Sequence, residues 1–161
     1  MRVLQKGLPM STLISTKGRY ALRAMADLAE NQGDALIPLA EVAERQGISE
    51  KYLESIVTTL SKAGLIQGQR GKGGGYRLAY PAQDYSIATI LKAVEGPIVP
   101  VACLAENAPV CANRAGCRTL PFWEDLDGLI NDYLESVTLQ DLLDRGVAFP
   151  PCVAGSAEER A

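Results

Sequence analysis

The chain has 161 residues and a mass of 17.2 kDa, with 47% apolar and 22% charged residues. This length fits one globular domain or two small lobes and excludes a catalytic barrel, which needs roughly 250 residues. The absence of histidine excludes Ser-His and Cys-His catalysis and histidine-ligated zinc. Without an apolar run of about 20 residues or a signal peptide, we expect a cytoplasmic protein with no membrane partner.

The net charge of −3 conceals two halves of opposite sign. Up to Glu95, twelve Lys and Arg stand against nine Asp and Glu, which gives a net charge of +3. From Gly96 onward, four Arg stand against ten acidic residues, which gives −6. We therefore expect any phosphate-binding face to lie in the first half.

The chain begins with residues 1–10, which have no helical period and are predicted to form a disordered arm. Apolar residues at helical spacing then predict an amphipathic helix that starts at Thr16 and stops at Gly33. Three cations on this helix either contact a DNA backbone or form an ordinary solvated face: Lys17, Arg19 and Arg23.

Two shorter helices are predicted next. One follows Pro38 and ends at Gly47, and the other is capped by Ser49 and runs to Gly64. Two short helices joined by a tight glycine turn are typical of a helix-turn-helix. By themselves they fit a plain helical hairpin equally well.

Residues 65–80 distinguish these alternatives, because they predict a short hairpin with a glycine-rich tip. Leu65, Gln67 and Gln69 alternate before the tip, and Tyr76, Leu78 and Tyr80 alternate after it. The tip, residues 70–75, carries two cations on a backbone that can approach another surface closely. This pattern predicts a wing. A phosphate-cradling loop is disfavoured, because no Lys-Ser or Lys-Thr pair and no helix follow the glycines.

The second half starts where a helix capped by Ser86 ends at Gly96. Residues 97–118 have no period and contain three cysteines, which is unusually long for a simple connection. Residues 119–147 predict a long helix and a short one, and the apolar stripe of the long helix is wider than one lobe can cover. Residues 148–161 are predicted to be a disordered tail. We expect a mainly α fold with a small β wing, in which 11–96 form a winged helix-turn-helix domain.

Several segments together carry a family resemblance: STKGRYALRAM, ISEKYLESIVTTLSKAGLI, RGKGGGY, and three cysteines before LPFWEDL. The chain resembles the Rrf-type winged-helix transcriptional regulators, in particular IscR-like members with the cysteine spacing of iron-responsive proteins. The resemblance covers roughly residues 10–144. It implies a homodimeric DNA-binding repressor or activator, of which we favour a repressor, with the long helix as the dimer seam.

A dimer would place two recognition helices one helical turn apart on a palindromic operator in double-stranded DNA. Lys51 can meet a phosphate or a guanine edge, and Glu54 can accept from a cytosine amino group. Glu54 also matches the base-reading acid that the resemblance implies. Tyr52 is either a DNA contact or part of the core. The predicted DNA-binding residues are Ser49, Lys51, Tyr52, Glu54, Ser55, Arg70, Lys72, Gly73 and Gly74.

Cys103, Cys111 and Cys117 are the predicted metal- and cofactor-binding residues. An odd number of thiols in a cytoplasmic protein does not suit a disulfide framework. Thiolate clusters suit iron–sulfur centres or zinc, and a thiol redox switch or no function at all are the remaining alternatives. We favour an iron–sulfur cluster, [2Fe-2S] or [4Fe-4S].

The fourth ligand is the missing part of this hypothesis. Leu120 and Arg19 stand where relatives place a ligating His or acid, and neither can ligate. A water or a small thiol can fill the position, as can one of several side chains: Glu106, Asn107, Asn113, Glu124 and Cys152.

The sequence therefore predicts a transcriptional regulator whose operator affinity depends on a cluster that senses iron, cluster status, oxygen or nitric oxide. One alternative is a cluster-free member of the same family, controlled by a partner protein or a thiol metabolite. Another is a metal-binding interaction protein that does not bind DNA. An enzyme is not expected, because no acid-base pair or nucleophile constellation is present.

Overall fold

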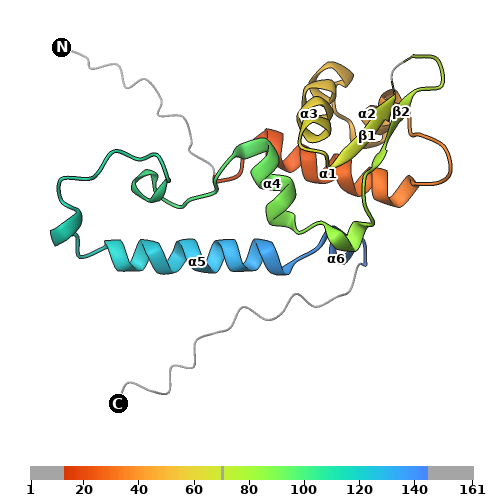
Figure 1. Cartoon of the computed structure of the whole chain (residues 1–161). Coiled ribbons are helices and arrows are strands. Elements are labelled where there is room, and N and C mark those ends of the chain that lie inside the picture. The colour runs from red at the N-terminus through yellow and green to blue at the C-terminus, as the bar shows by residue number, and fades with distance from the viewer. Residues whose placement is uncertain (1–12, 70, 145–161) are drawn as a thin grey trace, which may run out of the picture.

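The computed structural model describes residues 13–69 and 71–144 (Figure 1). Its architecture is mainly helical with one two-stranded antiparallel sheet, as predicted. The elements in chain order are α1 (Thr16–Asn31), α2 (Leu39–Gln46), α3 (Glu50–Lys62), β1 (Ile66–Gln69), β2 (Gly75–Leu78), η1 (Ala82–Asp84), α4 (Ile87–Glu95), η2 (Ala102–Leu104), η3 (Arg114–Gly116), α5 (Leu120–Ser136) and α6 (Leu139–Leu143). The predicted arm, 1–10, and tail, 148–161, lie outside the described residues.

Hydroxyl side chains set the starts of four helices. The side chain at each N-cap accepts a hydrogen bond from a backbone N–H of the first turn, which satisfies a donor that has no partner within the helix. These N-cap residues are Ser15, Ser49, Ser86 and Thr138. Gly47 ends α2 in the left-handed conformation, with φ of 63°, so the turn into α3 needs glycine.

The hydrophobic core lies around α1, which packs against α2, α3, α4, α6 and β2. Met25 and Leu28 of α1 are buried with Leu53 and Ile56 of α3. Leu139 of α6 belongs to the same cluster, although the whole cysteine loop and α5 separate it from α4 in the chain. Two backbone hydrogen bonds of 2.9 Å attach the start of α6 to the start of α4. Ile87 N–H donates to the Val137 carbonyl, and Leu139 N–H donates to the Tyr85 carbonyl.

The wing pairs Ile66 with Leu78 and Gln69 with Gly75. Its base is held by a further bridge, in which Ile37 and Tyr76 exchange two backbone hydrogen bonds of 3.0 and 2.8 Å. The alternation expected from Leu65 is wrong at its start, because Leu65 and Ile66 are both buried. Leu65 lies in the turn from α3, where its N–H donates to the Leu60 carbonyl, and the pleat begins only at the next residue.

Helix α5 extends along one side of the molecule, and the loop of residues 97–119 leads from α4 to its N-terminal end and reaches past that end in this view (Figure 1). Its C-terminal end contacts α4, where Lys92 and Glu135 form an ion pair of 2.8 Å. None of its described side chains is buried, and three large apolar ones are exposed: Phe122 (60%), Leu129 (69%) and Tyr133 (43%). Among residues 13–69 and 71–144, no helix has the length and apolar character needed for a membrane crossing.

Candidate nucleic-acid interface and cysteine loop

The N-terminal turn of α3 presents two serines whose hydroxyls are already oriented by the helix backbone. Ser49 Oγ accepts from the Tyr52 N–H at 3.3 Å, so its own proton stays available for donation. Ser55 Oγ donates to the Tyr52 carbonyl at 2.7 Å, so its lone pairs stay available to accept. The two predicted contacts therefore offer complementary hydrogen-bonding roles toward DNA.

Lys51 and Glu54 lie on the exposed face of α3, as the prediction requires. Within the described residues, neither takes part in an ion pair or a side-chain hydrogen bond, so both charged groups face solvent. Such a pair can act on DNA in opposite ways, because Lys51 attracts phosphate whereas Glu54 repels it and can accept from a base.

Tyr52 was predicted to be either a DNA contact or part of the core, and its environment is intermediate between the two. Its side chain is 37% exposed, so it is not a core residue. Its ring meets Tyr20 of α1 edge-on, with centroids 5.8 Å apart. The guanidinium of Arg23 lies 5.4 Å from the Tyr20 ring centroid. Tyr52 thus has one side supported by α1 and another open to solvent.

The three cations on α1 have intramolecular partners. Lys17 Nζ donates to Thr59 Oγ1 of α3 at 3.3 Å, and Arg19 donates to Thr16 Oγ1 at 3.2 Å. Arg23 donates to the side chain and the carbonyl of Gln46 at the end of α2. Lys17 and Arg23 therefore brace the helices around the predicted reading surface.

The wing tip depends on glycine at several positions. Gly71 and Gly73 have φ of 103° and 78°, which side chains other than glycine rarely adopt. A Cβ at Gly74 would overlap the Gln69 carbonyl. Lys72 is exposed at this tip, whereas Arg70 lies outside the described residues. Lys72, Gly73 and Gly74 thus share one tight, accessible turn.

A groove between α3 and the wing was missed by the sequence interpretation. It is lined by Thr58, Ser61 and Lys62 of α3 and by Gly68 and Tyr76 of the hairpin. The signal was present in the sequence, because Lys51, Glu54, Ser55, Thr58 and Lys62 follow one another at helical spacing on the exposed side of α3. The polar surface of α3 therefore extends beyond the predicted N-terminal turn.

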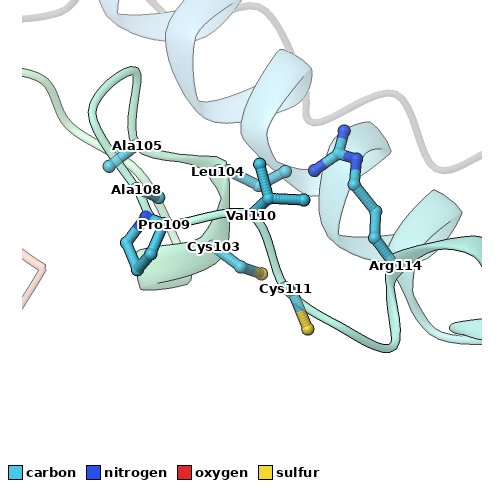
Figure 2. Close-up of a pocket in the computed structure, with 8 residues that line it drawn as sticks. All are labelled: Cys103, Leu104, Ala105, Ala108, Pro109, Val110, Cys111 and Arg114. Atoms are coloured by element: carbon cyan, nitrogen blue, oxygen red, sulfur yellow. The ribbon is translucent and has the colours of Figure 1, made fainter.

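Two of the three loop cysteines lie together. Cys103 and Cys111 line one pocket with Arg114, and Figure 2 shows both sulfur atoms directed to the same side of the loop. Both side chains are exposed. Arg114 reaches from this loop to Glu124 of α5, with an ion pair of 3.2 Å.

Cys117 is half-buried and is not part of this pocket. Its sulfur lies 3.4 Å from Thr119 Oγ1. Hydrogen bonds from the Thr119 side chain and then from the backbone of Thr119 and Leu120 lower the pKa of the thiol, with a smaller contribution from the charge of Arg114. The start of α5 therefore favours the thiolate that a metal ligand requires.

The donor set fits an iron–sulfur cluster in its chemistry, since it offers three thiols, of which two are exposed and the third has a lowered pKa. The conformation brings together only Cys103 and Cys111. Within the part of the chain that the structure describes, no three His, Cys, Asp or Glu side chains are grouped closely enough to hold a metal ion. Cys152, one of the fourth ligands considered, lies outside that part.

The Rrf2 family, described as iron-dependent transcriptional regulators, matches residues 14–145. The chain belongs to the Rrf2 family of winged-helix transcriptional regulators. IscR of Vibrio vulnificus, a helix-turn-helix-type transcriptional regulator, is 41% identical over 130 residues, which cover 81% of this chain and 76% of IscR.

Solved structures of Rrf2-like regulators share this fold. The structure of IscR from T. potens is 38% identical with a TM-score of 0.64, over 83% of this chain and 88% of that one. CymR, the global cysteine regulator of B. subtilis, is 35% identical with a TM-score of 0.64, over 80% and 94%. The family and the IscR relative are both described as transcriptional regulators, which confirms the predicted family and the predicted DNA-binding regulatory role.

Proposed function

We propose that this Rrf2 regulator is a cytoplasmic homodimeric repressor that binds a palindromic operator and whose operator affinity depends on an iron–sulfur cluster. The observation that carries the DNA-binding part is the continuous surface made by α3 and the wing. Thr58, Ser61 and Lys62 line a groove with Gly68 and Tyr76, which joins the helix to the hairpin. This surface combines a helix that can enter a major groove with a tip that can approach the backbone.

On this surface, the predicted residues other than Tyr52 have distinct tasks. Lys51 and Lys72 neutralise phosphates, with Arg70 as the second cation of the wing. Ser49 donates and Ser55 accepts, as their own hydrogen bonds leave them free to do. Glu54 accepts from a cytosine amino group and disfavours other bases. Gly73 and Gly74 allow the wing backbone to approach a groove closely.

Exposed apolar side chains on α5 support dimerisation. Phe122 and Leu129 are exposed on a helix of which no described side chain is buried. A monomer would leave this apolar surface in water, whereas a second copy related by a twofold axis would cover it. A twofold dimer also supplies the pair of recognition helices that a palindrome requires.

Cys103, Cys111 and Cys117 would hold the cluster, with a fourth ligand from outside this triad. When bound, the cluster would link the loop to the start of α5 and respond to oxygen, nitric oxide or iron loss. The chain's own contribution is to present two thiols in one pocket and a thiol with a lowered pKa nearby. Arg114 keeps the intervening loop attached to α5 through Glu124.

Anaerobic purification tests this proposal directly. We expect coloured protein with iron and acid-labile sulfide, and a dimer by light scattering. Its affinity for a palindromic duplex, selected by the protein from a random library, should change at least tenfold when the cluster is removed. Cys103→Ala should abolish that change, and Leu129→Glu should give a monomer. Protein without iron or sulfide, or operator binding indifferent to Cys103→Ala under every redox condition, would contradict the cluster proposal.

A cluster-free regulator is the second candidate, and the pocket that pairs Cys103 and Cys111 with Arg114 favours it. The disulfide form of a small acidic thiol could place a carboxylate near Arg114, and one cysteine thiolate could attack it by thiol–disulfide exchange, which forms a mixed disulfide and releases the other half as the free thiol. Colourless anaerobic protein that binds the palindrome, with an affinity altered by such a disulfide and restored by a reductant, would support this function. If duplex binding did not weaken steeply with salt, both the cluster-dependent and the cluster-free regulator would be contradicted.

A further inference from the structure

The carboxylate of Glu95, the last residue of α4, reaches the N-terminus of α1. One oxygen, Oε1, accepts three hydrogen bonds there. The donors are the Ser15 backbone N–H at 3.0 Å, the Ser15 hydroxyl at 2.6 Å and the Gly18 N–H at 2.9 Å. Glu95 and Ser15 are 80 positions apart in the chain, so this contact is a tertiary one.

The contact completes a helix cap that usually lies within one short segment. In a capping box, the acid at the third helical position reaches back to the N–H of the N-cap residue. Here the N-cap is Ser15, the third position is Gly18, and Glu95 supplies the acid from another helix. A Cβ at Gly18 would overlap the Glu95 carboxylate, so the glycine leaves the room that this arrangement needs.

The same end of α1 is attached to the recognition helix. Lys17 Nζ donates to Thr59 Oγ1 at 3.3 Å, and Thr59 in turn donates to the Ser55 carbonyl at 3.0 Å. Ser55 is one of the predicted DNA contacts. A shift of the α1 N-terminus would therefore also move the exposed face of α3 that carries the predicted DNA contacts.

On its other side, Glu95 adjoins the root of the cysteine loop. Gly96, with φ of 80°, ends α4 and turns the chain toward Ile98. Ile98 is buried, and its carbonyl accepts from Asn131 Nδ2 of α5 at 3.3 Å. Glu95 thus lies where α1, the loop and α5 come together.

We propose that Glu95 is a positioning residue for operator recognition, because it fixes α1 and, through Lys17, the recognition helix. As the last residue before the loop root, it also conveys the state of the cysteine loop to α3. This second part rests on the proposed cluster function, whereas the first does not.

Three variants and one control test the positioning role in cluster-free protein. Glu95→Ala removes the acceptor, and Gly18→Ala displaces the flexible end of the carboxylate while introducing a better helix former. We expect each to lower affinity for the selected palindromic duplex at least tenfold, with affinity for a scrambled duplex within twofold of wild type. Glu95→Gln keeps an acceptor oxygen and should stay within threefold. Glu135→Ala, which removes a carboxylate bonded to Ser86 and Lys92 on the same helix, should bind normally.

The Gly18→Ala variant keeps the test decisive if Glu95→Ala unfolds. Wild-type operator affinity in a folded Gly18→Ala protein, or equal losses on palindromic and scrambled duplexes, would overturn the positioning role. In cluster-loaded protein, the change of operator affinity on cluster removal should fall to within twofold in Gly18→Ala, at wild-type iron content. If Gly18→Ala protein kept the wild-type change of operator affinity on cluster removal, Glu95 would not convey the state of the cysteine loop. If wild-type protein binds no iron, the cluster proposal fails separately, and the cluster-free comparison still decides the role of Glu95.

Discussion

The ring of Tyr20 on α1 meets the ring of Tyr52 on α3 edge-on, with the two centroids 5.8 Å apart. Edge-to-face pairs of this kind contribute about 0.5–1.5 kcal/mol beyond the area they bury. Because Tyr52 lies in the first turn of the recognition helix, the pair connects α1 to the part of α3 that would read bases. The aromatic contact therefore bears on DNA binding as well as on stability.

We expect Tyr20→Ala to weaken operator binding severalfold, because Tyr52 loses its support and gains rotamer freedom. Tyr20→Phe retains the ring and serves as the matched control, with near wild-type affinity. Fluorescence anisotropy with the selected duplex measures both. If Tyr20→Ala binds as tightly as Tyr20→Phe, the aromatic pair does not position Tyr52.

Lys72 on the wing should affect how strongly DNA affinity depends on salt concentration. Each phosphate contact releases counterions, so the loss of one should reduce the slope of log affinity against log salt by about one. We expect Lys72→Ala to reduce the slope by this amount on palindromic and scrambled duplexes alike. Lys92→Ala is the control, because Lys92 lies on α4 and pairs with Glu135. Equal slopes in Lys72→Ala and wild type would exclude a phosphate contact by Lys72.

Glu54 should affect the choice between bases and not the salt dependence of binding. A carboxylate that accepts from cytosine discriminates against the wrong base by about 1–3 kcal/mol. We expect Glu54→Gln to lose that discrimination at one operator position and to bind scrambled duplexes more tightly. Glu50→Gln removes a charge from the same helix turn and should raise affinity without changing base preference. A panel of single-base operator variants distinguishes the two, and an unchanged base profile in Glu54→Gln would remove Glu54 from base reading.

Local signals explain why so much of the fold was predictable from sequence. Ser49 and Ser86 each cap a helix through a bond to the residue three positions on, and Gly47 ends α2 through its own φ. Each of these interactions is complete within a few residues. The wing was recognisable for the same reason, since its tip depends on glycines that are adjacent in the chain.

The contacts that were not predictable join distant residues. Gly18 gives no sign that Glu95 will take the place of its missing side chain. Lys62 becomes part of a groove only when the hairpin brings Tyr76 beside it. For the same reason, cysteine spacing could suggest a ligand set but not that Cys103 and Cys111 would share a pocket without Cys117.

A buried carboxylate between α1 and α2 makes a prediction about stability. Asp27 is 2% exposed, and it accepts from Arg45 and Gln46, with Arg45 Nη2 at 2.7 Å from Oδ1. We expect Arg45→Met to lower the free energy of unfolding by about 3 kcal/mol, because Asp27 loses its countercharge. Glu41→Gln, which disrupts only the surface pair with Arg45, should cost less than about 1 kcal/mol. Urea unfolding measures both, and similar losses would contradict the distinction.

The cap of α6 should make the stability of the protein depend on pH. Asp141 accepts from the Thr138 backbone N–H and hydroxyl, both at 2.8 Å, and these bonds lower its pKa from the ordinary 3.8, the backbone bond most strongly. A lowered pKa in the folded state stabilises the protein above the ordinary value and ceases to do so as pH falls through the lowered one. We therefore expect the difference in urea midpoint between wild type and Asp141→Asn to be constant from pH 7 to 5 and to shrink below about pH 4. In the Asp141→Asn background, Thr138→Val should cost less than it does in wild type, since the two side chains share one interaction. A difference that stayed constant down to the lowest pH at which both proteins fold would show that the charge of Asp141 does not stabilise the cap.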